Sequence, residues 1–127
     1  MEGQMPTPGL RASVEETIAE EHTAERLGSG DLPVLGTPAL LALVERAAVE
    51  ALRGHLPEGT TSVGARVELD HLAPSPIGAR VTATATLEAV EGSVLRFAFE
   101  VTDPSGIVAR GIHLRVAVDR RTFLERP

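Results

Sequence analysis

Several residue types that support common protein chemistries are missing from this sequence. It contains no cysteine, so disulfides, thiolate nucleophiles, iron–sulfur clusters and cysteine-ligated zinc are excluded. It also contains no lysine, which excludes Schiff-base chemistry on a lysine side chain. Aromatic residues make up 2% of the chain, as three phenylalanines without tryptophan or tyrosine. We therefore expect no stacking platform for nucleic-acid bases.

The charge and the length of the chain further restrict the class of protein. The chain has 12 basic and 18 acidic residues, whereas phosphate binding needs a clustered cationic face. No apolar run approaches the roughly 20 residues of a membrane helix, and residues 1–10 lack a secretory pattern. We therefore expect a cytoplasmic protein without nucleic-acid or membrane partners. A length of 127 residues predicts one domain, residues 12–127, behind a flexible leader of residues 1–11.

One segment of the chain has a clear helical pattern. Residues 38–53 are rich in Leu, Ala and Val, start with Pro38 and are followed by Gly54, which is typical of a helix end. The Thr37 hydroxyl is expected to cap this helix. A flexible loop, residues 28–36, precedes it. Residues 12–27 are ambiguous, because their pattern fits either a helix or a first strand with one solvated face.

The periodicity changes to two after the helix. Val63, Ala65, Val67 and Leu69 are expected on one face of a strand, and similar alternation predicts strands over residues 80–90, 95–101 and 107–118. The short turns between the last three strands favour an antiparallel meander. One helix packed on one curved antiparallel sheet is an α+β fold. The sheet's uncovered face and edges favour a dimer.

Two ionisable side chains interrupt the apolar pattern. On a helical wheel Glu45 lies roughly 110° from the charged stripe of Arg46, Glu50 and Arg53, among Leu and Ala side chains. Glu45 is therefore either a rim residue that extends to water or a carboxylate with a perturbed pKa at a functional site. His71 continues the apolar row at the end of its strand. It is either a buried structural histidine or a group for proton transfer.

The Thr37 hydroxyl adds a third polar group, at a helix N-terminus that favours a carbonyl or anionic ligand. Threonine, glutamate and histidine together are suited to attack on an acyl carbon. His113 is interpreted as structural or surface, and His22 and His55 receive no role. The sequence has no clustered ligand pattern, so we expect neither a metal nor a cofactor.

Three strings carry a resemblance to a known family. Residues 36–45 (GTPALLALVE), 62–78 (SVGARVELDHLAPSPIG) and 81–85 (VTATA) resemble the fluoroacetyl-CoA thioesterase-like proteins. The resemblance covers residues 14–118 in the order of elements. It is most specific at Thr37, Glu45, Gly64 and His71, because the separations between these positions match as well as the residue types.

The resemblance implies a hot-dog fold, in which about five antiparallel strands wrap one long central helix. It implies hydrolysis of acyl-CoA thioesters by a homodimer, or by a dimer of such dimers. Thr37, Glu45 and His71 would be the catalytic residues, Gly64 would lie near the thioester, and Arg115 would contact the substrate. Strand parity places Gly64 and His71 on opposite faces, so a shared site would need a β-bulge or a second subunit.

The loop of residues 28–36 departs from the family. The fluoroacetyl-specific enzyme has aromatic lid residues before its helix, and this loop has none. We therefore expect a short- or medium-chain acyl-CoA as substrate, with Arg80, Arg110 and Arg115 as candidate CoA contacts. The alternatives are a non-catalytic protein that binds acyl-CoA or an acyl carrier, and an enoyl-CoA hydratase.

Overall fold

The structure is a computed structural model that describes residues 4–125. Its elements follow one another along the chain as β1 (Arg11–Thr17), a 3-10 turn η1 (Glu20–His22), α1 (Ala24–Leu27), α2 (Thr37–Leu52), β2 (Thr60–His71), β3 (Arg80–Glu91), β4 (Val94–Asp103) and β5 (Gly106–Asp119). The ambiguous segment of residues 12–27 thus begins as a strand, over residues 12–17, and continues with two short helical turns.

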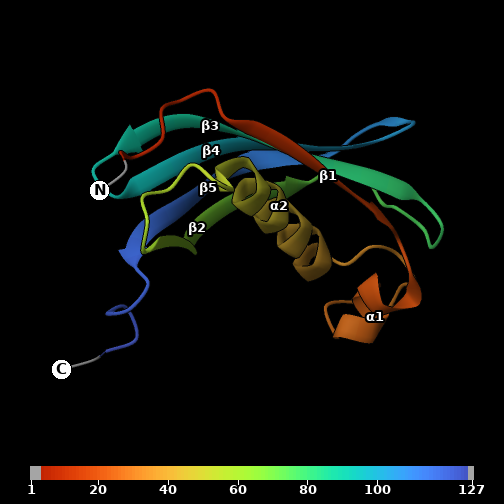
Figure 1. Ribbon diagram of the computed structural model, residues 1–127. Helices are drawn as coiled ribbons and strands as arrows, with labels where there is room; N and C mark the ends of the chain where they lie inside the picture. The colour runs from red at the N-terminus through yellow and green to blue at the C-terminus, as the bar shows by residue number, and fades with distance from the viewer. Residues whose placement is uncertain (1–3, 126–127) are drawn as a thin grey trace.

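All five strands form one antiparallel sheet in the order β1-β3-β4-β5-β2. The sheet curves around α2, which crosses its inner face (Figure 1). This confirms the α+β class and the single long helix on a five-stranded sheet. Because α2 packs mainly on β1 and β3, the inner faces of β5 and β2 are less covered by the helix.

The core lies between α2 and the middle strands. Apolar side chains at helical spacing on α2 meet the alternate residues of β3 and β4, and removal of this surface from water stabilises the layered packing. On α2, β3 and β4 the most buried members are Leu40, Val44, Ala47, Ala48, Val81, Ala83, Ala85, Leu95, Phe97 and Val101, each 0% exposed.

The N-terminus of α2 differs from the expectation by one residue. Gly36 is the N-cap and Thr37 is the first helical residue, and no side chain caps the helix. The prediction of Thr37 as the cap is therefore wrong. Its hydroxyl is free to bond outside the helix. At the other end Gly54 has φ +79°, a left-handed conformation that glycine adopts without strain, as expected after a helix.

A β-bulge in β2 changes which residues face the helix. The pairing of β2 with β5 shifts between Gly64 and Arg66, so that Ala65 is an extra residue. Gly64 lies opposite Arg115 and His71 lies opposite Ala109, on the same inner face. The expected common face for Val63, Ala65 and Val67 is therefore wrong, and the β-bulge, one of the two alternatives for a shared site, is present.

The fold begins inside the expected leader of residues 1–11. The Gly9 amide donates to the Leu87 carbonyl, and the Leu87 amide donates to the Leu10 carbonyl, both at 2.8 Å. Arg11 is already part of β1. Residues 1–3 of the leader and residues 126–127 lie outside the described residues. Within residues 4–125, no helix is long and apolar enough to cross a membrane.

Candidate active site

The first pair of candidate site residues joins the start of α2 to the end of β2. The Thr37 hydroxyl and His71 Nδ1 are 2.9 Å apart, a hydrogen bond in which the hydroxyl can donate or accept. His71 Nε2 is buried and has no hydrogen-bond partner among the described residues. Burial lowers the pKa of His71 and the nearby backbone of Ala73 opposes this, so the neutral ring is favoured.

An open cavity of about 320 Å³ lies in front of this pair. Its walls come from the loop before α2, the N-terminus of α2 and the turn after β2, with Gly36, Thr37, His71, Leu72 and Ala73 among the lining residues. The unpaired amides of a helix N-terminus attract a carbonyl or anionic oxygen. The cavity thus places a hydroxyl, an imidazole and these amides around one ligand position.

The second pair of candidate site residues includes Glu45, further along α2. Glu45 Oε2 is 3.5 Å from Arg115 Nη1, and the glutamate side chain is 40% exposed, whereas that of Arg115 is 7% exposed. The carboxylate lies over the backbone of Gly64, where a Cβ atom would come within 2.3 Å of Glu45 Oε2. Gly64 therefore provides the space that the carboxylate occupies.

Arg115 is held by a buried polar network. Its Nε donates to Ser62 Oγ at 2.8 Å, its Nη2 donates to the Ser62 carbonyl at 3.1 Å, and its Nη1 lies 3.2 Å from His113 Nε2. His113 is 0% exposed, so of its two interpretations the surface one is wrong and the structural one agrees with its burial. Burial lowers the pKa of Arg115, and Glu45 opposes this by stabilising the charge.

The two pairs are separated within one chain. Thr37 and Glu45 are eight residues apart on α2, a distance of about 12 Å at the helical rise. Glu45 contacts Gly64 and Arg115, whereas Thr37 contacts His71. One chain therefore presents two half-sites. A reaction that needs all three predicted catalytic groups at one substrate requires a second copy.

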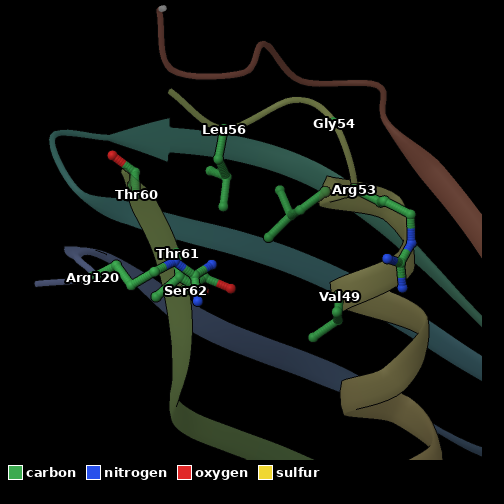
Figure 2. A pocket seen from close by; sticks show the side chains of 9 residues that line it. Val49, Arg53, Gly54, Leu56, Thr60, Thr61, Ser62 and Arg120 are labelled. Carbon is green, nitrogen blue, oxygen red and sulfur yellow. The ribbon is translucent and has the colours of Figure 1, made fainter. Parts of the chain in front are cut away.

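Two cavities flank the Glu45 half-site. One, of about 470 Å³, is lined by Glu45, Arg46, Val49, Arg53 and Arg115 among others. The other, of about 240 Å³, lies between the C-terminal end of α2 and the start of β2 and shares Val49 and Arg53 with the first. Figure 2 shows Val49 and Leu56 directed into this space, opposite Thr61 and Ser62 of β2.

Sequence reasoning identified most of these residues and missed two. Arg115 is at the site, but Arg80 pairs with Glu15 and Arg110 is exposed, and neither lines the three cavities described above. Ser62 and His113 were missed. The signal for His113 was its position two residues before Arg115, which puts both on one strand face. Among the described residues, no three His, Asp or Glu side chains are grouped to hold a metal ion.

Comparisons with known proteins point to one family. The model of the Fluoroacetyl-CoA-specific thioesterase family matches residues 18–121. The fluoroacetyl-CoA thioesterase of Streptantibioticus cattleyicolor is 32% identical over 90 residues, 71% of this chain. The matched segment spans 65% of the length of that curated relative.

Solved structures agree in fold. The fluoroacetyl-CoA thioesterase FlK is similar with a TM-score of 0.87 and 26% identity, over 98% of this chain and 100% of that chain. A hot-dog-like protein from Thermanaerovibrio acidaminovorans is similar with a TM-score of 0.82 and 33% identity, over 92% and 86% of the two chains. The expected family and the hot-dog fold are confirmed, and the chain belongs to the fluoroacetyl-CoA-specific thioesterase family.

Proposed function

We propose that this protein is an acyl-CoA thioesterase that hydrolyses a short- or medium-chain acyl-CoA to the free acid and CoA. The observation that carries this proposal is the hydrogen bond of 2.9 Å between Thr37 and His71, which leaves His71 Nε2 buried and unpaired among the described residues. Glu45 offers the complementary group, a half-exposed carboxylate held by Arg115 over Gly64. Family membership supports thioester hydrolysis by these groups.

The working form in this proposal is a homodimer that pairs two β2 strands. β2 is an edge strand of 12 residues, and within residues 4–125 it pairs only with β5. An unpaired edge presents a row of amide and carbonyl groups that a second copy can complete. In an antiparallel pair, residues that lie opposite each other share a face, so the half-sites of the two copies can meet.

One register joins the half-sites. With Ala65 counted as the extra residue of the bulge, a two-fold axis at Glu68 places Gly64 opposite the partner's His71. The same register places Arg66 opposite the partner's Asp70, a pair of opposite charge, and both side chains are exposed in the single chain. In this register the Glu68 residues of the two copies face each other at the axis. Each is close to an arginine of its own chain, since Arg66 Nη2 lies 2.9 Å from Glu68 Oε2. Charge complementarity therefore supports this register.

The chemistry follows from the combined site. Glu45 either removes a proton from water as the water attacks the thioester carbonyl, or attacks the carbonyl itself to form an anhydride that water then cleaves. In both routes the carbon–sulfur bond breaks, and the CoA thiolate leaves and takes up a proton. The partner's His71 supplies or orients that proton, and the partner's Thr37 hydrogen-bonds the reacting group.

The cavities beside Glu45 support the proposed length of the substrate's acyl chain. Their shared lining residues, Val49 and Arg53, make the end cavity a continuation of the one at Glu45. Two of the nearby cations are already paired, because Arg46 bonds Glu16 and Arg53 bonds Glu50, whereas Arg120 at the end cavity makes no ion pair among the described residues. An apolar acyl chain fits such a groove better than the phosphates of CoA. We place the CoA arm on the open side, near Thr37 and His71.

The test is a thiol-release assay with acetyl-, butyryl-, hexanoyl- and octanoyl-CoA. We expect turnover by the parent protein, and losses of about 100-fold or more in kcat for Glu45→Gln and His71→Ala. Glu88→Gln, at an exposed glutamate that pairs with Arg96 and lines none of the three cavities, is the matched control. Equal rates for all four proteins would contradict the proposal. Hydration of crotonyl-CoA without thiol release would favour the hydratase, and binding without either reaction would favour the non-catalytic protein that binds acyl-CoA or an acyl carrier.

A further inference from the structure

His113 lies behind the Glu45 half-site, in a buried position that fixes its hydrogen bonding. Its Nδ1 is 3.0 Å from the Arg66 carbonyl oxygen, and its Nε2 is 3.2 Å from Arg115 Nη1. The ring stacks on Phe97 of β4, with centroids 6.4 Å apart. The position is 0% exposed, so water does not compete for these contacts.

The chemistry of the two neighbours determines the tautomer of His113. A carbonyl oxygen only accepts hydrogen bonds, so Nδ1 carries a proton and donates it. A guanidinium only donates, so Nε2 has no proton and accepts from Arg115. The ring is therefore neutral and in its Nδ1–H form. Burial lowers the pKa of His113, and the positive charge of Arg115 lowers it further, whereas the Arg66 carbonyl and Glu45 oppose these effects.

We propose that His113 is a positioning residue, which holds the Arg115 guanidinium so that one of its N–H groups meets Glu45. This inference rests on the proposed function, because it concerns the same carboxylate. Ser62 accepts from Nε and Nη2, and His113 accepts from one N–H group of Nη1, which leaves the other N–H group of Nη1 for Glu45. Glu45 Oε2 meets that atom at 3.5 Å, and Oε1 makes no hydrogen bond to the described residues and is available for the reaction.

Two amide variants separate the contacts of His113. In His113→Gln the longer side chain brings an oxygen near the Nε2 position, where it can accept from Arg115. In His113→Asn the shorter amide can still donate to the Arg66 carbonyl but does not reach Arg115. We expect His113→Asn to lower kcat for acyl-CoA hydrolysis by about 10- to 100-fold and to leave KM nearly unchanged, and His113→Gln to recover most of the loss.

A double-mutant cycle tests whether His113 acts through Arg115. In an Arg115→Ala background, His113→Asn should add no further loss of kcat. If Glu45→Gln abolishes turnover but the parent, His113→Asn and His113→Gln have equal rates, the inference is overturned. An additive cycle would also overturn it. If Glu45→Gln has no effect, the proposed function fails instead.

One measurement does not depend on catalytic activity. Long-range ¹H–¹⁵N spectra of the parent protein at pH 7 report which ring nitrogen of each histidine carries the proton. We expect the Nδ1–H form at His113, assigned by the signal that disappears in His113→Gln. A protonated Nε2 at His113 would overturn the inference, because that atom could not then accept from Arg115.

Discussion

Gly64 and Glu45 are in direct contact, since a Cβ atom at Gly64 would lie 2.3 Å from Glu45 Oε2. Gly64 is not among the described glycines with a positive φ, so alanine fits its backbone. We predict that Gly64→Ala displaces the carboxylate and lowers kcat by about 100-fold. Its unfolding free energy should not fall, because alanine restricts the unfolded chain. Urea unfolding and thiol-release kinetics check this, and an active Gly64→Ala variant would contradict the role of the contact.

The Thr37 hydroxyl forms a hydrogen bond with His71 and does not cap α2. Thr37→Val should therefore lower kcat by about 10- to 100-fold, through loss of the His71 partner, without the destabilisation that follows removal of a helix cap. Thr37→Ser keeps the hydroxyl and is the matched control. Thermal unfolding and kinetics of both variants make the comparison. Equal losses in kcat for serine and valine would exclude the hydrogen bond as the cause.

The proposed groove predicts how rate depends on chain length. Burial of one methylene is equivalent to about a fourfold gain in kcat/KM, so kcat/KM should rise from acetyl- to hexanoyl-CoA. Val49 is 42% exposed on α2, and a larger side chain there need not disturb the core. Val49→Trp should reduce kcat/KM for octanoyl-CoA at least tenfold and leave acetyl-CoA nearly unchanged. A uniform loss across the panel would place the acyl chain elsewhere.

The proposed β2 register predicts a charge-reversal rescue. Arg66→Glu should place like charges opposite each other in the dimer, weaken association and lower activity at low protein concentration. Arg66→Glu combined with Asp70→Arg should restore both. Sedimentation velocity and activity as a function of concentration provide the measurement. A single variant that remains dimeric and active, or a double variant that remains dissociated, would rule out this register.

The lowered pKa values of two histidines predict a loss of stability in mild acid. Burial lowers the pKa of both His71 and His113 from an ordinary value of 6.5. As pH falls below about 6.5 the unfolded chain takes up protons before the folded chain does, so the unfolding free energy decreases until the folded-state pKa values are passed. Urea unfolding between pH 8 and 5 measures this change. His113→Gln should make the decrease shallower, and an unchanged slope would show that His113 does not contribute.

Periodicity and turn residues predicted the helix to within one residue and all four strands that follow it. They failed where the outcome depends on contacts between distant segments. The bulge at Ala65 breaks the parity rule that sequence reasoning applied, and only the pairing with β5 reveals it. Thr37 looked like a cap because its competing partner, His71, is 34 residues away. The environment of His113 likewise depends on the registers of β4 and β5.

The position of β2 in the sheet has a consequence for how the protein folds. Strands β3, β4 and β5 are joined by tight turns, whereas β2 must find β5 across the whole hairpin region, with Thr60 opposite Asp119 and His71 opposite Ala109. Closing a long loop costs more entropy and slows the step that requires it. We therefore expect Gly64 and His71 to enter the sheet late, so that during refolding the catalytic rate recovers after the circular dichroism signal of the helix.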